Sequence, residues 1–270
     1  MAVNKRITEF ESWQSFTVFA RSIKSKSRHI LDRSARKFLR AVIQGASQRE
    51  RKLLKGSALW RAQIGHGWTQ FPQDGVECQI PSPLESERMT PLADSAREGR
   101  VNPKGIPCFY LATDKETAMS EVRPWVGMYV SVGQFKILKN LVLIDCTSEK
   151  SDGFTFYFEE PSAAEIEKAV WTSIDRAFSE PINPNDAIAD YAPTQVLSEA
   201  IKNKGYDGLI YKSVLGPGYN IALFDLKKAA IENCRLFRAK RLSFEFEEMA
   251  NPYFVKKQYK RPRASLKKLG

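Results

Sequence analysis

The stretch YAPTQVLSEAIKNKGYDGLIYKSVLGPGYNIALFD, residues 191–225, indicates how the chain folds, because it contains a helix and two strands in close succession. Residues 194–205 predict a helix that is closed by Gly205, with an aromatic residue next as the hydrophobic contact of such an end. Enrichment in β-branched and aromatic residues predicts short strands on either side of a Gly-Pro-Gly turn, at 208–212 and 220–224.

The same mixture continues upstream of this stretch. Further runs rich in β-branched or aromatic residues predict strands at 58–62, 107–112, 127–138 and 141–145. The run from 127 to 145 has the pattern of an antiparallel pair. Because the predicted strands do not alternate regularly with helices, the sequence favours an α+β fold with a mixed or antiparallel sheet and short helices over a doubly wound fold.

Two more helices are predicted between these strands. The first covers residues 113–123, with Thr113 and Glu116 spaced as a capping box and Pro124 ending it. The second covers residues 161–178 and begins with proline and acidic residues, which helix N-termini favour.

Length and composition set the general class of protein. The chain has 270 residues, of which 43% are hydrophobic and 27% charged, so it can bury a substantial core without disulfides. No apolar run is long enough to span a membrane, and the N-terminal sequence MAVNKRITEFESWQSF has charged residues where a signal peptide would be apolar. We therefore expect a soluble cytoplasmic protein with no membrane partner.

The net charge of +11 is unevenly distributed along the chain. Residues 1–55 contain 14 Lys/Arg against 4 Asp/Glu, and residues 235–270 contain 11 against 3. Residues 56–234 are mildly acidic, with 17 Lys/Arg against 24 Asp/Glu. This pattern predicts a basic helical N-terminal extension (1–55), a central domain (56–234) and a basic C-terminal tail (235–270).

The basic flanks allow two interpretations. Apolar residues in the N-terminal flank recur at spacings of three and four, and residues 25–45 predict an amphipathic helix that ends at Gly45. Such a helix either binds an anionic surface such as nucleic acid or packs its apolar stripe onto its own domain, and we favour packing. The C-terminal residues 251–270 mix aromatic with basic residues, which suits either nucleic-acid contact or a frayed, solubilising end.

Cysteine and histidine usage argues against a metal site. The sequence has no CxxC or HExxH motif and only two histidines, His29 and His66. The cysteines lie in or beside apolar runs, so we interpret all four as buried, reduced thiols: Cys78, Cys108, Cys146 and Cys234.

Motifs for Rossmann, P-loop and α/β-hydrolase chemistry are absent from the sequence. The remaining candidates are polar residues at strand ends and on one short helix: Arg61, Arg100, Tyr110, Glu121, Ser213 and Asn220. Arg61 lies within the apolar run ALWRA, where an arginine is costly to bury unless it meets an anion or a carboxylate. Glu121, taken by itself, has the features of an exposed helical carboxylate paired with Lys115 or Arg123.

Three blocks of sequence together resemble the RES-domain family, which is best known for NAD⁺-consuming toxins of bacterial toxin–antitoxin modules. The blocks are LWRA (59–62), GRVNPKGIPCFYLATDKETAMSEVR (99–123) and the stretch 191–225 quoted above. The resemblance implies an ADP-ribosyltransferase-like fold and makes residues 56–234 a RES-type NAD-binding catalytic domain. It also implies NAD⁺ as substrate rather than as a prosthetic group, and a small DNA-binding antitoxin as partner.

The resemblance also assigns roles to the candidate residues. Arg61, Glu121 and Ser213 match the residues that name the family and are the expected catalytic set. The expected NAD⁺-binding set is Arg61, Arg100, Tyr110 and Asn220. A carboxylate such as Glu121 stabilises the positive charge that develops on the ribose when the nicotinamide bond breaks. We expect Ser213 to donate a positioning hydrogen bond rather than act as a nucleophile. For Asn220 we favour a bond to backbone at the start of its strand over contact with the ligand.

Three functions remain open at this point. The first is degradation of NAD⁺ by hydrolysis or phosphorolysis, the second is mono-ADP-ribosylation of a protein acceptor, and the third is nucleic-acid binding through the basic termini. The sequence departs from small family toxins in having Ala62 where some have an aromatic residue after the first arginine. It also carries long inserts at 66–98 and 147–193, which we interpret as loops able to reshape the pocket.

Overall fold

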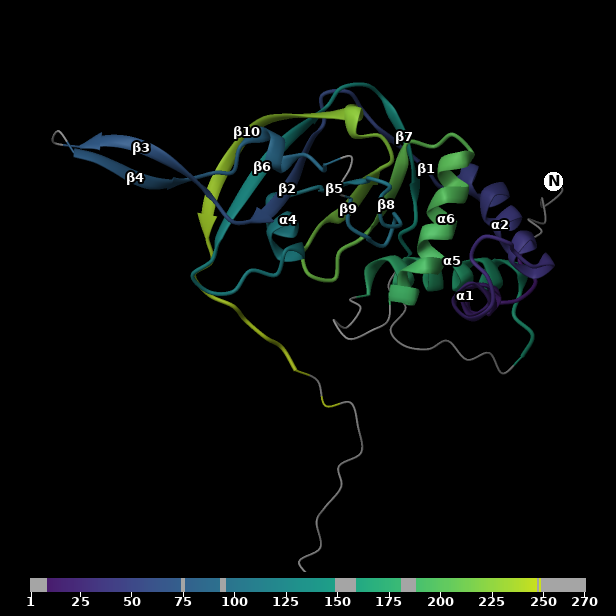
Figure 1. Cartoon of the computed structure of the whole chain (residues 1–270). Helices are drawn as coiled ribbons and strands as arrows, with labels where there is room; N and C mark the ends of the chain where they lie inside the picture. The colour runs from purple at the N-terminus through teal and green to yellow at the C-terminus, as the bar shows by residue number, and fades with distance from the viewer. Residues whose placement is uncertain are drawn as a thin grey trace, which may run out of the picture.

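The computed structural model describes residues 9–73, 76–92, 96–148, 159–180, 188–246 and 248 (Figure 1). The strands are β1 (Glu50–Leu53), β2 (Ala58–Ile64), β3 (Gly67–Gln73), β4 (Val76–Ser82), β5 (Phe109–Ala112), β6 (Tyr129–Ile137), β7 (Leu141–Asp145), β8 (Gly208–Lys212), β9 (Tyr219–Leu223) and β10 (Ala229–Arg238). The α-helices are α1 (Ser15–Ser25), α2 (Arg33–Ala46), α3 (Ser86–Met89), α4 (Lys115–Glu121), α5 (Ala163–Ser179) and α6 (Ala192–Asn203). Each predicted strand and helix has a counterpart with ends shifted by a few residues, except that the helix expected at 25–45 begins only at Arg33.

Eight of the strands form one sheet in the order β1-β7-β8-β9-β5-β2-β6-β10. Only β7 and β8 pair in parallel, and every other pairing is antiparallel, so the predicted α+β class is confirmed. The expectation that residues 127–145 form an antiparallel pair is wrong. The two strands in that run, β6 and β7, are separated in the sheet by β8, β9, β5 and β2, because β6 takes β2 and β10 as neighbours while β7 takes β1 and β8.

The short helix α4 begins differently from the prediction. Its N-cap is Asp114, whose Oδ1 accepts a hydrogen bond of 2.7 Å from the backbone N–H of Thr117, so the capping box of Thr113 and Glu116 is wrong. The Thr113 hydroxyl instead accepts a hydrogen bond of 2.9 Å from the backbone N–H of Tyr219 on β9. The start of α4 is therefore tied to the strand that follows Ser213.

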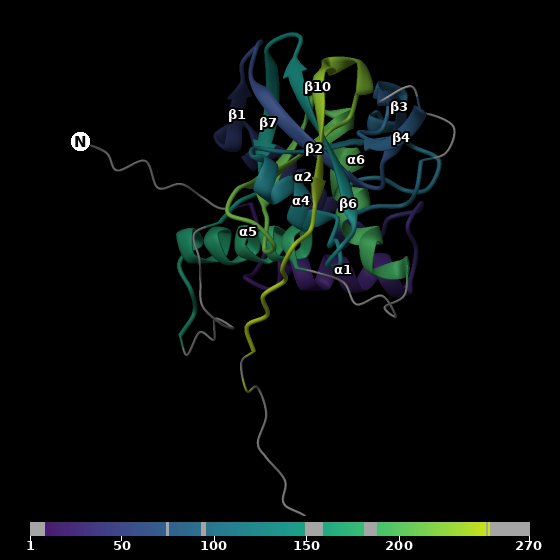
Figure 2. The ribbon, with the colours of Figure 1, turned by 90° about the vertical axis from the view of Figure 1, so that its left-hand side faces the viewer.

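The basic N-terminal flank packs onto the rest of the molecule. It forms two helices, and the helix predicted at 25–45 is shorter than expected, because Asp32 caps α2 after a break at 26–32. Gly45 lies inside α2 rather than beyond its end, and a Cβ there would touch the Trp171 ring at 4.0 Å. A shared core of buried residues joins α1 and α2 to α5 and α6, and includes Phe19, Phe38, Val42, Trp171, Ile174 and Leu197. Packing onto the domain, the interpretation we favoured, is confirmed (Figures 1 and 2).

The insert at 66–98 is not a simple loop. Residues 67–73 and 76–82 pair as the antiparallel strands β3 and β4, a hairpin that projects away from the sheet (Figure 1), and α3 follows it. The projecting hairpin exposes Trp68 and Phe71. The later insert at 147–193 contains α5, as predicted, and the short 3-10 helix Ile188–Tyr191.

The cysteine prediction holds for two of the four thiols. Cys108 and Cys146 are buried, whereas Cys78 and Cys234 are partly exposed because they lie on the projecting hairpin and on the edge strand β10. Among the described residues, no group of three His, Cys, Asp or Glu side chains is placed to hold a metal ion. No helix within the described ranges is long and apolar enough to cross a membrane.

The division of the chain at residues 55 and 234 stays a prediction. The strand β1, which belongs to the predicted extension, pairs with β7 in the main sheet, and β10 extends to Arg238. Residues 251–270 of the basic tail lie outside the described residues, so its two interpretations also stay open.

Candidate active site

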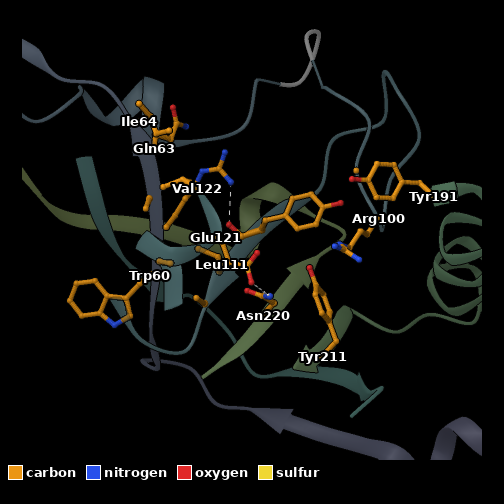
Figure 3. A pocket seen from close by; sticks show the side chains of 16 residues that line it. Trp60, Gln63, Ile64, Arg100, Leu111, Glu121, Val122, Tyr191, Tyr211 and Asn220 are labelled. Atoms are coloured by element: carbon orange, nitrogen blue, oxygen red, sulfur yellow. Dashed lines mark hydrogen bonds between the residues drawn. The ribbon is translucent and has the colours of Figure 1, made fainter. Parts of the chain in front are cut away.

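A cavity of about 570 Å³ opens between β2, α4, β5 and the ends of β8 and β9 (Figure 3). Five of the six candidate residues line this cavity: Arg61, Arg100, Tyr110, Glu121 and Asn220. Ser213 does not line it, but its hydroxyl donates a hydrogen bond to the Glu121 carboxylate. The structure therefore brings together residues that are up to 159 positions apart in the sequence, between Arg61 and Asn220.

Glu121 is held through one of its two carboxylate oxygens. Its Oε1 accepts hydrogen bonds of 2.7 Å from the Ser213 hydroxyl and of 2.7 Å from the Asn220 amide. Its Oε2 accepts no hydrogen bond from any described residue, and the side chain is exposed at the cavity. The carboxylate is thus fixed in position and still has an oxygen available for a ligand. The expected pairing with Lys115 or Arg123 is wrong, because Lys115 pairs with Glu116 and no described ion pair involves Glu121.

Ser213 is oriented by its own loop. Its Oγ accepts hydrogen bonds from the backbone N–H groups of Leu215 at 3.1 Å and Gly216 at 3.0 Å, so its proton is directed to Glu121. This is the positioning geometry expected for Ser213. Neither His29 nor His66 lines the cavity, so no histidine is placed to activate Ser213 as a nucleophile.

Two glycines let the Ser213 loop approach α4 closely. The backbone N–H of Gly218 donates a hydrogen bond of 2.8 Å to the Thr117 hydroxyl, which in turn donates to Asp114 at 2.9 Å. A Cβ on Gly216 would lie 2.6 Å from the Thr117 Cα, a distance that no side chain can adopt. These contacts join the loop to the first turn of α4 and so fix the distance between Ser213 and Glu121.

Asn220 has a different partner from the one that the sequence favoured. Its buried side chain donates to the Glu121 carboxylate at 2.7 Å rather than to backbone. Asn220 is also the β9 residue opposite Ala112 on β5, two strands' width from Arg61 on β2. The backbone-bonding interpretation is therefore wrong, and Asn220 belongs to the cavity.

Arg61 pairs with no carboxylate in the part of the chain that the structure describes. Its Nη1 donates a hydrogen bond of 3.1 Å to the backbone carbonyl of Tyr110, and its buried Nε has no hydrogen-bond partner among the described residues. The guanidinium lies 5.8 Å from the centre of the Phe109 ring. Burial lowers the pKa of Arg61 from its ordinary value, but an arginine stays charged at neutral pH. A buried, partly unpaired guanidinium is a feature of anion-binding sites.

Arg100 is weakly held at the other side of the cavity. Its Nη1 is 3.4 Å from the backbone carbonyl of Ala177, a long hydrogen bond, and its guanidinium lies 6.0 Å from the centre of the Tyr191 ring. Figure 3 shows Arg100 and Tyr191 together on the side away from Trp60. Most of the hydrogen-bonding capacity of Arg100 is therefore free for a ligand.

The loop that carries Arg100 is built around the buried side chain of Asn102. The Asn102 amide donates to three backbone carbonyls, those of Arg97 at 2.9 Å, Pro103 at 3.2 Å and Ile106 at 2.8 Å. From α6, the Gln195 amide donates to the carbonyls of Gly99 at 2.9 Å and Asn102 at 3.1 Å. This network places Arg100 at the cavity wall even though it lies on a loop.

Tyr110 uses its hydroxyl to hold the same loop. The hydroxyl donates to Asn102 Oδ1 at 2.7 Å and accepts from the backbone N–H of Val101 at 3.0 Å. Burial raises the pKa of Tyr110 well above its ordinary value, so the hydroxyl stays protonated. What Tyr110 contributes to the cavity is its ring.

Three aromatic residues of the wall were missed by the sequence analysis: Trp60, Tyr191 and Tyr211. Tyr211 is 4% exposed, and its hydroxyl has no hydrogen-bond partner among the described residues. Burial and the neighbouring Glu121 raise its pKa, and Arg100 acts in the opposite direction, so the hydroxyl lies near both charges (Figure 3). Tyr211 is the β8 residue opposite Asn220 on β9, so the pairing of these two strands places both side chains at the cavity.

A family match covers the stretch of chain that supplies every residue of the cavity wall. The family model described as "RES domain" matches residues 59–246, well over half of the chain. No curated protein matches the sequence. Among solved structures, a chain in the crystal structure of the M. tuberculosis MbcT–MbcA toxin–antitoxin complex is similar at 15% identity and a TM-score of 0.39, over 73% of this chain and 92% of that one.

Proposed function

The chain belongs to the RES-domain family, and from this premise we propose that it is an NAD⁺-degrading enzyme that cleaves the bond between nicotinamide and ribose. The observation that carries the proposal is the Glu121 carboxylate, which is fixed through Oε1 and free at Oε2. It faces a cavity that also contains two arginines with unused hydrogen-bonding capacity, Arg61 and Arg100.

The chemistry requires one well-placed carboxylate. Nicotinamide is cationic in NAD⁺ and leaves as a neutral molecule with the electron pair of the broken bond, so no acid is needed to protonate it. Positive charge develops on the ribose C1′ and ring oxygen as the bond breaks. Glu121 stabilises this charge without reorganisation because Ser213 and Asn220 already hold it in place.

The arginines and aromatic residues bind the rest of the substrate. Guanidinium groups form charge-assisted, often bidentate hydrogen bonds with phosphate, so Arg61 and Arg100 hold the pyrophosphate. The rings of Tyr191 and Trp60 provide flat apolar surfaces in the wall for the nicotinamide base. The Tyr211 hydroxyl, which has no hydrogen-bond partner within the described ranges, donates to a ribose oxygen.

Two acceptors complete the reaction with balanced products. With water, NAD⁺ gives nicotinamide, ADP-ribose and a proton. With inorganic phosphate, it gives nicotinamide and ADP-ribose 1-phosphate at the nicotinamide-side ribose. In a mono-ADP-ribosyltransferase the nucleophile is a protein side chain, and nicotinamide is released in the same way.

Product analysis tests this proposal. We expect the purified protein to release nicotinamide from NAD⁺, with the second product identified by mass spectrometry in buffers with and without phosphate. ADP-ribose in both buffers indicates hydrolysis, and a phosphate-dependent sugar phosphate indicates phosphorolysis. A mass increase of one ADP-ribose on protein, with little free product, favours transferase activity instead. Unchanged NAD⁺ under all of these conditions contradicts the proposal.

A toxin role follows from the family rather than from the cavity. We propose that expression of the wild-type chain depletes NAD⁺ and arrests growth, whereas the Glu121→Gln chain does neither, and that a small antitoxin protein restrains the enzyme. A neighbouring reading frame encoding a small DNA-binding protein that restores growth supports this role. Growth arrest that persists with Glu121→Gln favours the alternative of nucleic-acid binding through the basic termini, which predicts strongly salt-dependent binding.

A further inference from the structure

A second cavity lies beside the first and shares residues with it. Its volume is about 510 Å³, and both cavities are within the range of small-molecule sites, about 300–1,000 Å³. Arg61, Gln63 and Tyr110 line both cavities, so the two spaces meet at Arg61. The other described residues of the second wall include Arg88, Thr90, Leu92, Arg97, Glu98 and Cys108.

The wall of the second cavity carries an excess of positive charge. It contains three arginines, Arg61, Arg88 and Arg97, and one carboxylate, Glu98. Glu98 accepts a hydrogen bond of 3.0 Å from the Gln195 amide. Neither Arg88 nor Arg97 forms an ion pair with a residue in the described part of the chain. Unpaired arginines around a concave space select an anionic ligand.

The backbone at both arginines is held by side chains from outside the insert, Gln63 on β2 and Asn102 on the loop that carries Arg100. Gln63 on β2 donates a hydrogen bond of 2.6 Å to the backbone carbonyl of Arg88. The Asn102 amide donates 2.9 Å to the backbone carbonyl of Arg97. Both arginines belong to the insert at 66–98, so this insert supplies a wall to the pocket beyond its projecting hairpin.

We propose that the second cavity binds the nucleoside-monophosphate half of the dinucleotide, the half that does not carry nicotinamide. This inference rests on the proposed function. The scissile bond lies at Glu121 in the first cavity, the pyrophosphate lies at Arg61 where the cavities meet, and the distal phosphate-bearing nucleoside extends toward Arg88 and Arg97. The insert then makes the enzyme selective for a dinucleotide over a mononucleotide that contains the same scissile bond.

Truncated substrate tests the proposal. Nicotinamide mononucleotide contains the reacting bond but lacks the distal nucleotide. We expect Arg88→Gln and Arg97→Gln each to raise KM for NAD⁺ about ten- to hundredfold, as loss of a charge-assisted hydrogen bond does, with kcat unchanged. KM for nicotinamide mononucleotide stays at the wild-type value in both variants. Arg36→Gln, an exposed arginine on α2 that lines neither cavity, is the matched control and changes neither KM.

The proposal is overturned if Arg88→Gln and Arg97→Gln change KM equally for NAD⁺ and nicotinamide mononucleotide, or change KM for neither substrate. A binding experiment separates this failure from failure of the proposed function, because it needs no turnover. We expect 5′-AMP to bind the wild-type protein and Arg36→Gln with equal affinity by calorimetry, and the Arg88→Gln/Arg97→Gln double variant at least about tenfold more weakly. Equal 5′-AMP affinity in the double variant, or no 5′-AMP binding to the wild type, contradicts the proposal even if NAD⁺ is cleaved. Thermal melting confirms that each variant is folded.

Discussion

The two ends of the first cavity differ in how completely their charged groups are paired. At one end, Glu121 is held by Ser213 and Asn220, and the loop behind them is tied to α4. At the other end, Arg61 has a buried Nε without a partner, and Arg100 has one long hydrogen bond of 3.4 Å. The carboxylate is therefore positioned before any ligand arrives, whereas the arginines complete their hydrogen bonding only with one.

This difference has an energetic basis. A buried charged donor that lacks a partner destabilises a protein by about 1–3 kcal/mol or more, so an unpaired Arg61 is unfavourable for folding alone. A fixed carboxylate gains nothing for folding from leaving Oε2 free. Both features make sense when the anion and the positive charge of a substrate complete the site, and such departures from local rules concentrate at functional positions.

The largest expected effect comes from neutralising the fixed carboxylate. Glu121→Gln keeps a carbonyl oxygen that can accept from Ser213 and Asn220 but removes the negative charge, and we expect kcat to fall about 100- to 1000-fold, as for other electrostatic stabilisers. NAD⁺ consumption measured beside thermal melting checks this. The control is Glu116→Gln on the same helix, which lines neither cavity and should keep full activity. Full turnover by folded Glu121→Gln refutes the assignment.

Loosening the same carboxylate should have an intermediate effect. Ser213→Ala and Asn220→Ala each remove one of the two hydrogen bonds to Oε1, and we expect about a 10- to 100-fold loss of kcat because small misplacements of a reacting group are costly. Since both residues act through Glu121, the double variant should lose less than the product of the single losses. Strictly multiplicative losses would indicate that the two residues act independently of Glu121.

A substitution of Arg61, at the end of the cavity that contains the two arginines, should have a smaller effect and should weaken NAD⁺ binding rather than slow the reaction. Arg61→Lys keeps the charge but loses the planar fork, so we expect KM for NAD⁺ to rise about tenfold with little change in kcat. Steady-state kinetics separates the two parameters. Arg123→Lys, an exposed arginine that lines neither cavity, serves as the control. A loss confined to kcat would place Arg61 at the reacting bond instead.

The smallest expected effect concerns stability at high pH. Burial raises the pKa of the Cys108 thiol from 9.0 to about 12, so the folded state keeps a proton that the unfolded state loses above about pH 9. The stabilisation is complete below about pH 9 and is lost as the pH rises toward about 12. Urea unfolding across this range should show a shallower loss of stability for Cys108→Ala than for wild type. Cys78→Ala, on the projecting hairpin, should lose stability with rising pH as the wild type does. The same dependence of the free energy of unfolding on pH in the wild type and both variants would contradict the raised pKa of Cys108.

The sequence predicted local structure well because local structure depends on neighbouring residues. The helix end at Gly205 and the strand 208–212 follow from residue type and short spacing, and both are confirmed. The separation of β6 from β7 was not predictable in this way, because it depends on which strands from distant parts of the sequence pair with β6 and with β7.

The site residues show the same limit. Their types and positions at strand ends were visible in the sequence, and the resemblance to a family grouped them. The partner of Asn220 and the place of Tyr211 in the cavity wall were not predictable, because both depend on side chains that meet only after the chain has folded. The contribution of Arg88 and Arg97 was equally hidden, because an insert offers no periodic pattern that points to a cavity.

The most direct test of the account compares NAD⁺ binding and NAD⁺ cleavage in two variants. Calorimetry gives the Kd for NAD⁺, and rapid quench under single-turnover conditions gives the rate of nicotinamide release. We predict that Glu121→Gln binds NAD⁺ about as tightly as the wild type but releases nicotinamide at least about 100-fold more slowly. We predict that Arg61→Lys binds NAD⁺ more weakly than the wild type but, once saturated with NAD⁺, releases nicotinamide at nearly the wild-type rate. Wild-type release rates in Glu121→Gln, or loss of NAD⁺ binding in that variant with an unchanged rate at saturation, would contradict the account.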